Sequence, residues 1–222
     1  EISCSLVGSE MCIRDRSYTV TDAQTITITE CNKTISSIEI PAEINGLPVT
    51  EIKSYAFSDC KKFTSIVIPD SITTIGEKAF SGCEILASFT IPNTVTTIGG
   101  NAFSDTPWLA GKQAESPFVI VNHILIDAQT SSGDVVIPDN VTKISSYAFS
   151  GCTNLTSVIV PNTVTSIGAS AFSGCRNLTQ IFLPNSITQI QDNTFYHCTK
   201  LAKITIPDLS LIHISEPTRL QL

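Results

Sequence analysis

The sequence predicts a β-rich solenoid whose coils are each 23 residues long. Phenylalanine recurs with this period, and so does a proline that follows an apolar residue. The phenylalanine spacings are 23, 23, 46, 23 and 23, so the double step hides one degenerate repeat without loss of register. Such repeats are typical of stacked coils that bury apolar side chains only against their neighbours. The repeat positions are Phe57, Phe80, Phe103, Phe149, Phe172 and Phe195, and Pro69, Pro92, Pro138, Pro161, Pro184 and Pro207. We expect the phenylalanines to form the core, one per coil.

Each coil is expected to contain one short strand that ends at its proline. Residues 155–160 (LTSVIV) are rich in β-branched side chains and stop at Pro161, which indicates a strand closed by a turn. The residue after the proline is always Asp or Asn, and these side chains form turns by bonding nearby backbone amides. About nine of the 23 positions in each coil are apolar and are expected to point inward.

Residues 68–86 (IPDSITTIGEKAFSGCEIL) and 137–155 (IPDNVTKISSYAFSGCTNL) show the repeat most clearly. These segments and their neighbours resemble the BspA-like, or Treponema pallidum-type, leucine-rich repeat family. The resemblance implies a right-handed array with short parallel strands on one face and turns and short helical or 3-10 segments elsewhere. It also implies a bacterial or protist surface protein with a role in adhesion.

The resemblance extends over nearly all of residues 17–208 and suggests how they are organised. Residues 17–50 look like degenerate N-terminal rungs or a cap, and residues 51–208 like the leucine-rich repeat solenoid. One repeat, at about residues 105–133, departs from the pattern and has Thr106 where other repeats have cysteine.

The two ends of the chain, residues 1–16 and 209–222, are not expected to be native protein. Residues 6–15 (LVGSEMCIRD) resemble the translation of a transposase-type sequencing adapter, and residues 209–219 (LSLIHISEPTR) match what its reverse complement encodes. A single barcode sequence satisfies the remaining codons at both ends. Such scars are excluded from fold reasoning. Since Met11 is the only methionine, we expect residues 17–208 to be an interior piece of a longer reading frame.

Composition and motifs argue against several functions. The net charge of -7 disfavours a nucleic-acid partner, which needs a basic patch. No stretch approaches the roughly 18–20 apolar residues of a membrane span, so no membrane insertion is expected. Motifs typical of hydrolases, metalloproteases and phosphate-binding loops are missing from the sequence. We therefore expect neither enzyme activity nor a cofactor or metal.

Five cysteines each lie three residues after a repeat phenylalanine, so stacked coils would place them in one interior column about 4.8 Å apart. We expect free core thiols, because cysteine also serves as a small buried hydrophobe. A disulfide between neighbours such as Cys60 and Cys83 is an open alternative, and a metal site is less favoured because close Cys-x-x-Cys spacing is missing. Cys31 lies outside the column and is not placed by the pattern. The column consists of Cys60, Cys83, Cys152, Cys175 and Cys198.

The histidines and the single tryptophan each have a structural and a functional interpretation. His197 replaces the Gly or Asp of other repeats and is expected in a surface turn, and His123 in its apolar run is expected in the core or at an edge. Trp108 and Phe118, in the irregular stretch, either form a protruding ligand-binding knob or fill space left by missing repeat side chains. We favour the second interpretation and keep Trp108 as a candidate binding residue.

The outward face of the strands offers the main candidate binding site. If Leu155, Val158 and Val160 point inward, Ser157 and Ile159 point outward. The same register would expose one column of candidate binding residues, in which Ile159 and Phe182 should touch. A contiguous apolar column on a solenoid suits protein contact, although a merely structural stripe remains an alternative. The column consists of Val67, Thr90, Val136, Ile159, Phe182 and Thr205.

We therefore predict a non-catalytic extracellular or cell-surface module that acts in adhesion or protein interaction. Its partner would be a protein, or else a glycan, on a host or neighbouring cell. One alternative is a structural spacer. The other is an accessory region of a secreted enzyme whose catalytic domain lies outside this sequence.

Overall fold

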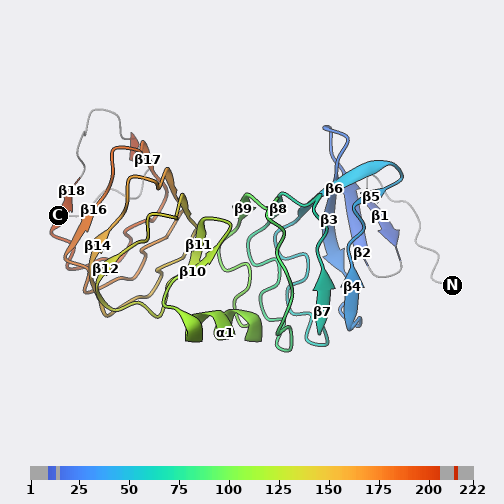
Figure 1. The fold of residues 1–222 in the computed structure, drawn as a ribbon, viewed down its shortest axis with the longest axis horizontal. Coiled ribbons are helices and arrows are strands. Elements are labelled where there is room, and N and C mark those ends of the chain that lie inside the picture. Colours follow the sequence, from blue (N-terminus) through green and yellow to red (C-terminus); the bar gives the residue numbers. More distant parts are fainter. Residues whose placement is uncertain (1–9, 14–15, 206–212, 215–222) are drawn as a thin grey trace. The chain divides into compact units, whose positions relative to one another are not determined.

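The computed structural model describes residues 10–13, 16–205 and 213–214 (Figure 1). Its contacts cluster within two compact units, unit 1 (residues 1–114) and unit 2 (residues 115–222). Each unit is built mainly of short strands, and the single helix of the described residues is α1 (Pro107–Glu115).

Unit 1 contains one large sheet that changes from antiparallel to parallel pairing along its length. β1, β2 and β3 pair antiparallel, and β3, β6, β8 and β9 then pair parallel in that order. β5 pairs with β6 alongside, and β4 forms a separate parallel pair with β7. The strands are β1 (Glu10–Ile13), β2 (Arg16–Val20), β3 (Ile26–Cys31), β4 (Ser37–Glu39), β5 (Glu43–Ile44), β6 (Leu47–Ile52), β7 (Ser65–Val67), β8 (Thr74–Ile75) and β9 (Thr97–Ile98).

Unit 2 contains two four-stranded sheets and one smaller pair. One sheet has the order β12-β14-β16-β18 and is parallel throughout, and these strands lie side by side in Figure 1. The other has the order β10-β11-β13-β15, and β17 pairs with β19. The strands are β10 (Val119–Val121), β11 (Ile124–Asp127), β12 (Gly133–Val136), β13 (Lys143–Ile144), β14 (Leu155–Ile159), β15 (Ser166–Ile167), β16 (Gln180–Phe182), β17 (Gln189–Ile190), β18 (Lys203–Thr205) and β19 (His213–Ile214).

The strand register confirms the predicted β-solenoid with its 23-residue period. Ile159 pairs with Val136 on one side and with Phe182 on the other, each 23 residues away. A second row of two-residue strands has the same spacing, as in the pairing of Ile144 with Ile167. The rest of each regular coil consists of consecutive turns, where the family resemblance also allowed short helical segments.

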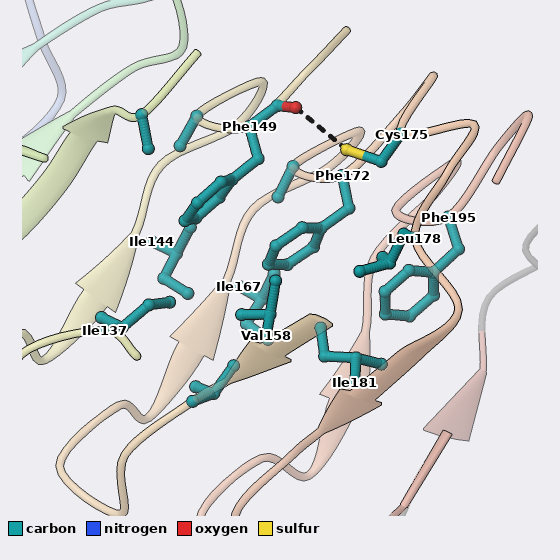
Figure 2. Close-up of a cluster of buried hydrophobic side chains, with 14 of the residues drawn as sticks. Ile137, Ile144, Phe149, Val158, Ile167, Phe172, Cys175, Leu178, Ile181 and Phe195 are labelled. Carbon is teal, nitrogen blue, oxygen red and sulfur yellow. Dashed lines mark hydrogen bonds between the residues drawn. The ribbon is translucent and has the colours of Figure 1, made fainter. Parts of the chain in front are cut away.

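The repeat phenylalanines stack in the interior of each unit. In unit 1 the ring centroids of Phe57 and Phe80 lie 5.1 Å apart, with the planes 9° from parallel. In unit 2, Phe149 and Phe172 lie 4.8 Å apart at 15°, and Phe195 continues the row (Figure 2). Parallel strands lie about 4.8 Å apart, so a ring at the same position of every coil must stack on the next one. All six repeat phenylalanines are buried, with exposed fractions of 0% to 7%.

Two positions in each coil adopt the left-handed backbone region, which costs a non-glycine residue of order 1 kcal/mol or more. One precedes the repeat phenylalanine by two residues and the other follows it by two. His197 occupies the second position with φ 57° and is exposed, which confirms its predicted place in a surface turn. The positions are Tyr55, Lys78, Asn101, Tyr147, Ser170 and Asn193, and Asp59, Gly82, Asp105, Gly151, Gly174 and His197.

The irregular repeat is a helix followed by a hairpin. The Thr106 side chain accepts a hydrogen bond from the Leu109 backbone N–H at 3.2 Å, and Pro107 occupies the first turn of α1. This is the arrangement of an N-cap followed by proline at the first helical position. The turn Asn122–His123 then joins β10 to β11, with both residues at positive φ, as type I′ hairpins require.

Short strands also occur within the two segments that we attribute to adapter sequence. β1 pairs at the edge with β2, and β19 pairs with β17. The β17–β19 register joins Ile190 to Ile214, a separation of 24 where the regular coils have 23. An exposed sheet edge accepts a strand through backbone hydrogen bonds alone, so this pairing needs no repeat sequence.

Candidate binding surface

The strand face of unit 2 is the outward surface of the sheet β12-β14-β16-β18. Leu155, Val158 and Val160 are buried beneath it, as predicted. Alternation alone would not place Leu155 and Val158 on one side, because they are three residues apart. The register shifts by one residue between Leu155 and Ser157, and this bulge at Thr156 resets the alternation.

An apolar column, formed by Val136, Ile159 and Phe182, runs across this face. Val136 is 62% exposed, Ile159 is 44% exposed and Phe182 is partly buried. Backbone pairing places the three on successive coils. The next position is Thr205, which pairs with Phe182, but its side chain lies outside the described residues.

The structure does not bring all six residues of the predicted column together. Val67 is 57% exposed on β7 of unit 1, where its strand neighbour is Glu39. Thr90 is exposed but belongs to no strand. The apolar column of unit 2 is therefore the part of the predicted site that the structure brings together.

A polar column lies beside the apolar one, two residues earlier on each strand. Asp134, Ser157, Gln180 and Lys203 pair in succession across the sheet. Ser157 was expected to be exposed but is only 7% exposed, because its neighbours cover it and the Gln180 Nε2 donates to its Oγ at 3.4 Å. Asp134 accepts a hydrogen bond from the Thr156 hydroxyl at 2.6 Å. The pattern within one coil does not reveal this column, although the 23-residue period aligns its members.

Trp108 does not form a protruding knob. Its ring lies 4.9 Å from Phe89 and 4.8 Å from Phe103, and its backbone N–H donates to the Leu86 carbonyl at 3.1 Å. It thus extends the aromatic stack of unit 1. Phe118 packs edge-on against Phe149 at 6.4 Å. Both contacts agree with the space-filling interpretation.

Four column cysteines are buried free thiols that bond to the backbone. Each Sγ donates to a carbonyl of the preceding coil, as Cys175 does to Phe149 at 3.1 Å (Figure 2). Burial raises the pKa of Cys83 to about 11. A thiol fits this position because it fills an apolar space and still reaches a carbonyl. The four are Cys83, Cys152, Cys175 and Cys198.

The expectation of a free thiol is wrong for Cys60, which forms a disulfide with Cys31. Cys31 ends β3, and its backbone N–H donates to the Ala56 carbonyl at 2.9 Å, so it lies beside the first regular coil. The two cysteines are 29 residues apart, so their pairing does not follow the repeat period. For that reason the pattern could not place Cys31.

Within residues 10–13, 16–205 and 213–214, three or more His, Cys, Asp or Glu side chains nowhere gather as a metal site would require. In the same ranges, none of the helical structure has the length and apolarity needed to cross a membrane.

These observations define a leucine-rich repeat β-solenoid with an exposed apolar column on its strand face. A family model described as "BspA type Leucine rich repeat region" matches six copies in residues 50–113 and 128–217. The chain belongs to this family, and the resemblance seen in its repeats is confirmed. The second matched range continues into residues that we attribute to adapter sequence. The family and fold are those of a repeat protein for protein interaction.

Several solved structures are similar to this chain. A leucine-rich repeat protein of T. pallidum has 28% identity and a TM-score of 0.47, with coverage of 88% of this chain and 81% of that one. One from Bacteroides ovatus has 24% identity and a TM-score of 0.43, covering 89% and 53%. A leucine-rich cell surface protein from Faecalibacterium prausnitzii has 20% identity and a TM-score of 0.37, covering 91% and 90%. Among curated proteins, no match was found.

Proposed function

We propose that this chain is a non-catalytic binding module of a cell-surface or secreted protein, and that it contacts a protein ligand in adhesion. The strand face of unit 2 is the proposed contact surface. Membership of the BspA-type family supports the surface location.

The single observation that carries the proposal is the exposed apolar column. The interior of unit 2 is already filled by the phenylalanine stack and the buried aliphatic side chains, so Ile159 and Phe182 are not needed to complete it. Contiguous exposed apolar side chains are favourable contact sites, and aromatic residues tend to dominate the energy of such contacts. A protein ligand suits this column, because Val136, Ile159 and Phe182 offer apolar contact and have no hydrogen-bonding group of their own.

The experiment compares two double variants in selection against displayed random dodecapeptides. We expect the wild-type chain to enrich a set of peptides, and Ile159→Ser with Phe182→Ser to abolish that enrichment. The control, Ile85→Ser with Tyr196→Ser, removes side chains that are 47% and 53% exposed and belong to turns rather than to the strands of this sheet. It should enrich the same peptides as the wild-type chain.

Stability separates loss of contact from loss of fold. Outward substitutions typically change the free energy of unfolding by no more than about 0.5 kcal/mol, so both variants should melt like the wild-type chain. If the Ile159/Phe182 variant still enriches the same peptides, or unfolds, the binding proposal fails. A spacer role then becomes the better account.

A further inference from the structure

The polar column of unit 2 carries opposite charges at its two ends. Asp134 stands at the β12 end and Lys203 at the β18 end, with the neutral Ser157 and Gln180 between them. Asp134 and Lys203 are both exposed. The apolar column runs alongside, so the strand face combines an apolar strip with an anionic and a cationic end.

The charged residues of unit 2 are divided along the chain in the same sense, although Asp127 is buried and lies in the other sheet. Four of the five acidic residues between positions 115 and 205 lie before residue 140, and three of the four basic residues lie after residue 175. Arg176 and Lys200 are both exposed. They lie on adjacent coils, since the Thr199 hydroxyl donates a hydrogen bond to the Arg176 carbonyl. Lys200 lies three residues before Lys203, and Asp139 lies five residues after Asp134 on the acidic side.

We propose that this charge polarity selects and orients the ligand of the strand face. The ligand is an extended peptide that has a basic and an acidic residue four positions apart and an apolar residue midway between them. The proposal rests on the function proposed above. The peptide crosses the strands between the two columns, so that its basic side chain reaches Asp134, its apolar side chain lies on Ile159 and Phe182, and its acidic side chain reaches Lys203.

The dimensions of the sheet fix the spacing of four. Asp134 and Lys203 are three strand intervals apart, which at about 4.8 Å each is roughly 14 Å. An extended peptide rises about 3.3 Å per residue, so residues i and i+4 are about 13 Å apart. Residues i, i+2 and i+4 also point to the same side of an extended chain, which presents all three to the face.

Charge reversal at either end tests the proposal with the same displayed dodecapeptides. The wild-type chain should enrich peptides with a base and an acid at i and i+4. Asp134→Lys should shift the enrichment to two acids with that spacing, and Lys203→Glu should shift it to two bases. Asp192→Lys, an equal reversal at an exposed turn residue, should leave the wild-type motif unchanged.

Direct binding of one enriched peptide gives the magnitude. Each reversal should raise its Kd about three- to ten-fold, as expected for exposed charge pairs that become repulsive. The difference should vanish at 1 M salt, where the Debye length is about 3 Å. Since Asp134 bonds to Thr156, Asp134→Asn serves as a second variant that removes the charge and keeps an acceptor.

The outcomes separate this inference from the proposed function. If peptides still require Ile159 and Phe182 but both Asp134→Lys and Lys203→Glu enrich the wild-type motif, charge orientation is wrong and the binding face stands. Enrichment that is insensitive to Ile159 and Phe182 contradicts both. A wild-type motif without charged residues at this spacing also overturns the inference.

Discussion

The cysteine column shows how one side chain meets two requirements at once. Cys152, Cys175 and Cys198 are buried at exposed fractions of 8% or less, yet each donates its S–H to a backbone carbonyl of the preceding coil. A valine would fill the space without the hydrogen bond. In the irregular repeat, Thr106 bonds to the Phe103 carbonyl at 2.7 Å and so keeps a donor at this position.

The buried thiols should resist labelling in the native protein. Burial raises the pKa of Cys83 to about 11, so only about one thiol in a thousand is ionised at pH 8. We expect peptide mapping after alkylation to find Cys83, Cys152 and Cys175 unmodified until denaturant is added. Fast native labelling of Cys152 or Cys175 would show that the interior column is wrongly placed.

The repeat phenylalanines make a second prediction at this scale. Phe149 is fully buried between its neighbours, so Phe149→Ala leaves a cavity and should cost about 3–5 kcal/mol of unfolding free energy. Urea denaturation measures this cost, with Phe149→Leu as a milder control. A loss below about 1 kcal/mol would contradict the inward register.

At the scale of the element, the coils stack so closely that some positions exclude a side chain. A Cβ added to Gly168 would lie 2.3 Å from the Ser146 backbone nitrogen, and Gly76 and Gly99 are in the same situation one coil apart. Glycine is therefore required by close approach of two backbones rather than by its own dihedral angles.

This packing predicts opposite effects for two glycine-to-alanine changes. Gly168→Ala should lower the melting temperature, because the clash involves backbone that cannot move without unstacking a coil. Gly111→Ala, in α1 with no atom within 4 Å of the added Cβ, should raise stability by about 0.5–1 kcal/mol. Calorimetry of both variants checks the pair, and equal melting temperatures would contradict the stacking described here.

The predictable part of the fold is the part that repeats. The positions of Phe57, Phe80 and Phe149 specify the coil length, and the strand before Pro161 follows from its β-branched residues. Two further local signals could have been used. The pair Thr106–Pro107 indicates the cap of α1, and the pair Asn45–Gly46 indicates the turn between β5 and β6. The Cys31–Cys60 pair could not be predicted, because its separation of 29 residues is not a multiple of the 23-residue repeat.

The candidate site was predictable only in part for a related reason. The alternation before Pro161 correctly placed Ile159 outward, and the period extended this to Val136 and Phe182. Periodicity assumes that every coil keeps its strand, whereas residues 88–90 do not form one, so Thr90 does not join the column. Burial of Ser157 depends on the long side chain of Gln180 on the next strand. The sequence pattern of the coil that contains Ser157 gives no information about that side chain.

At the scale of the whole chain, the repeats rather than the two ends should determine stability. A chain of residues 17–208 should melt within about 5 °C of the full 222-residue chain. Among the described residues removed, β1 and β19 pair with single strands, and Arg16 pairs with Cys31 and donates to the Glu39 carbonyl at 2.8 Å. A larger decrease in melting temperature would mean that these segments are part of the fold.

The proposed function requires that the ligand contacts the strand face of unit 2. Hydroxyl-radical footprinting tests it directly, because oxidation reports the solvent exposure of individual side chains with and without the most strongly enriched dodecapeptide. We expect bound peptide to protect Ile159 and Phe182, while Tyr55 and Tyr196, both 53% exposed, stay as reactive as before. Protection at Trp108 or Tyr196 with Ile159 and Phe182 unchanged would contradict the proposed function.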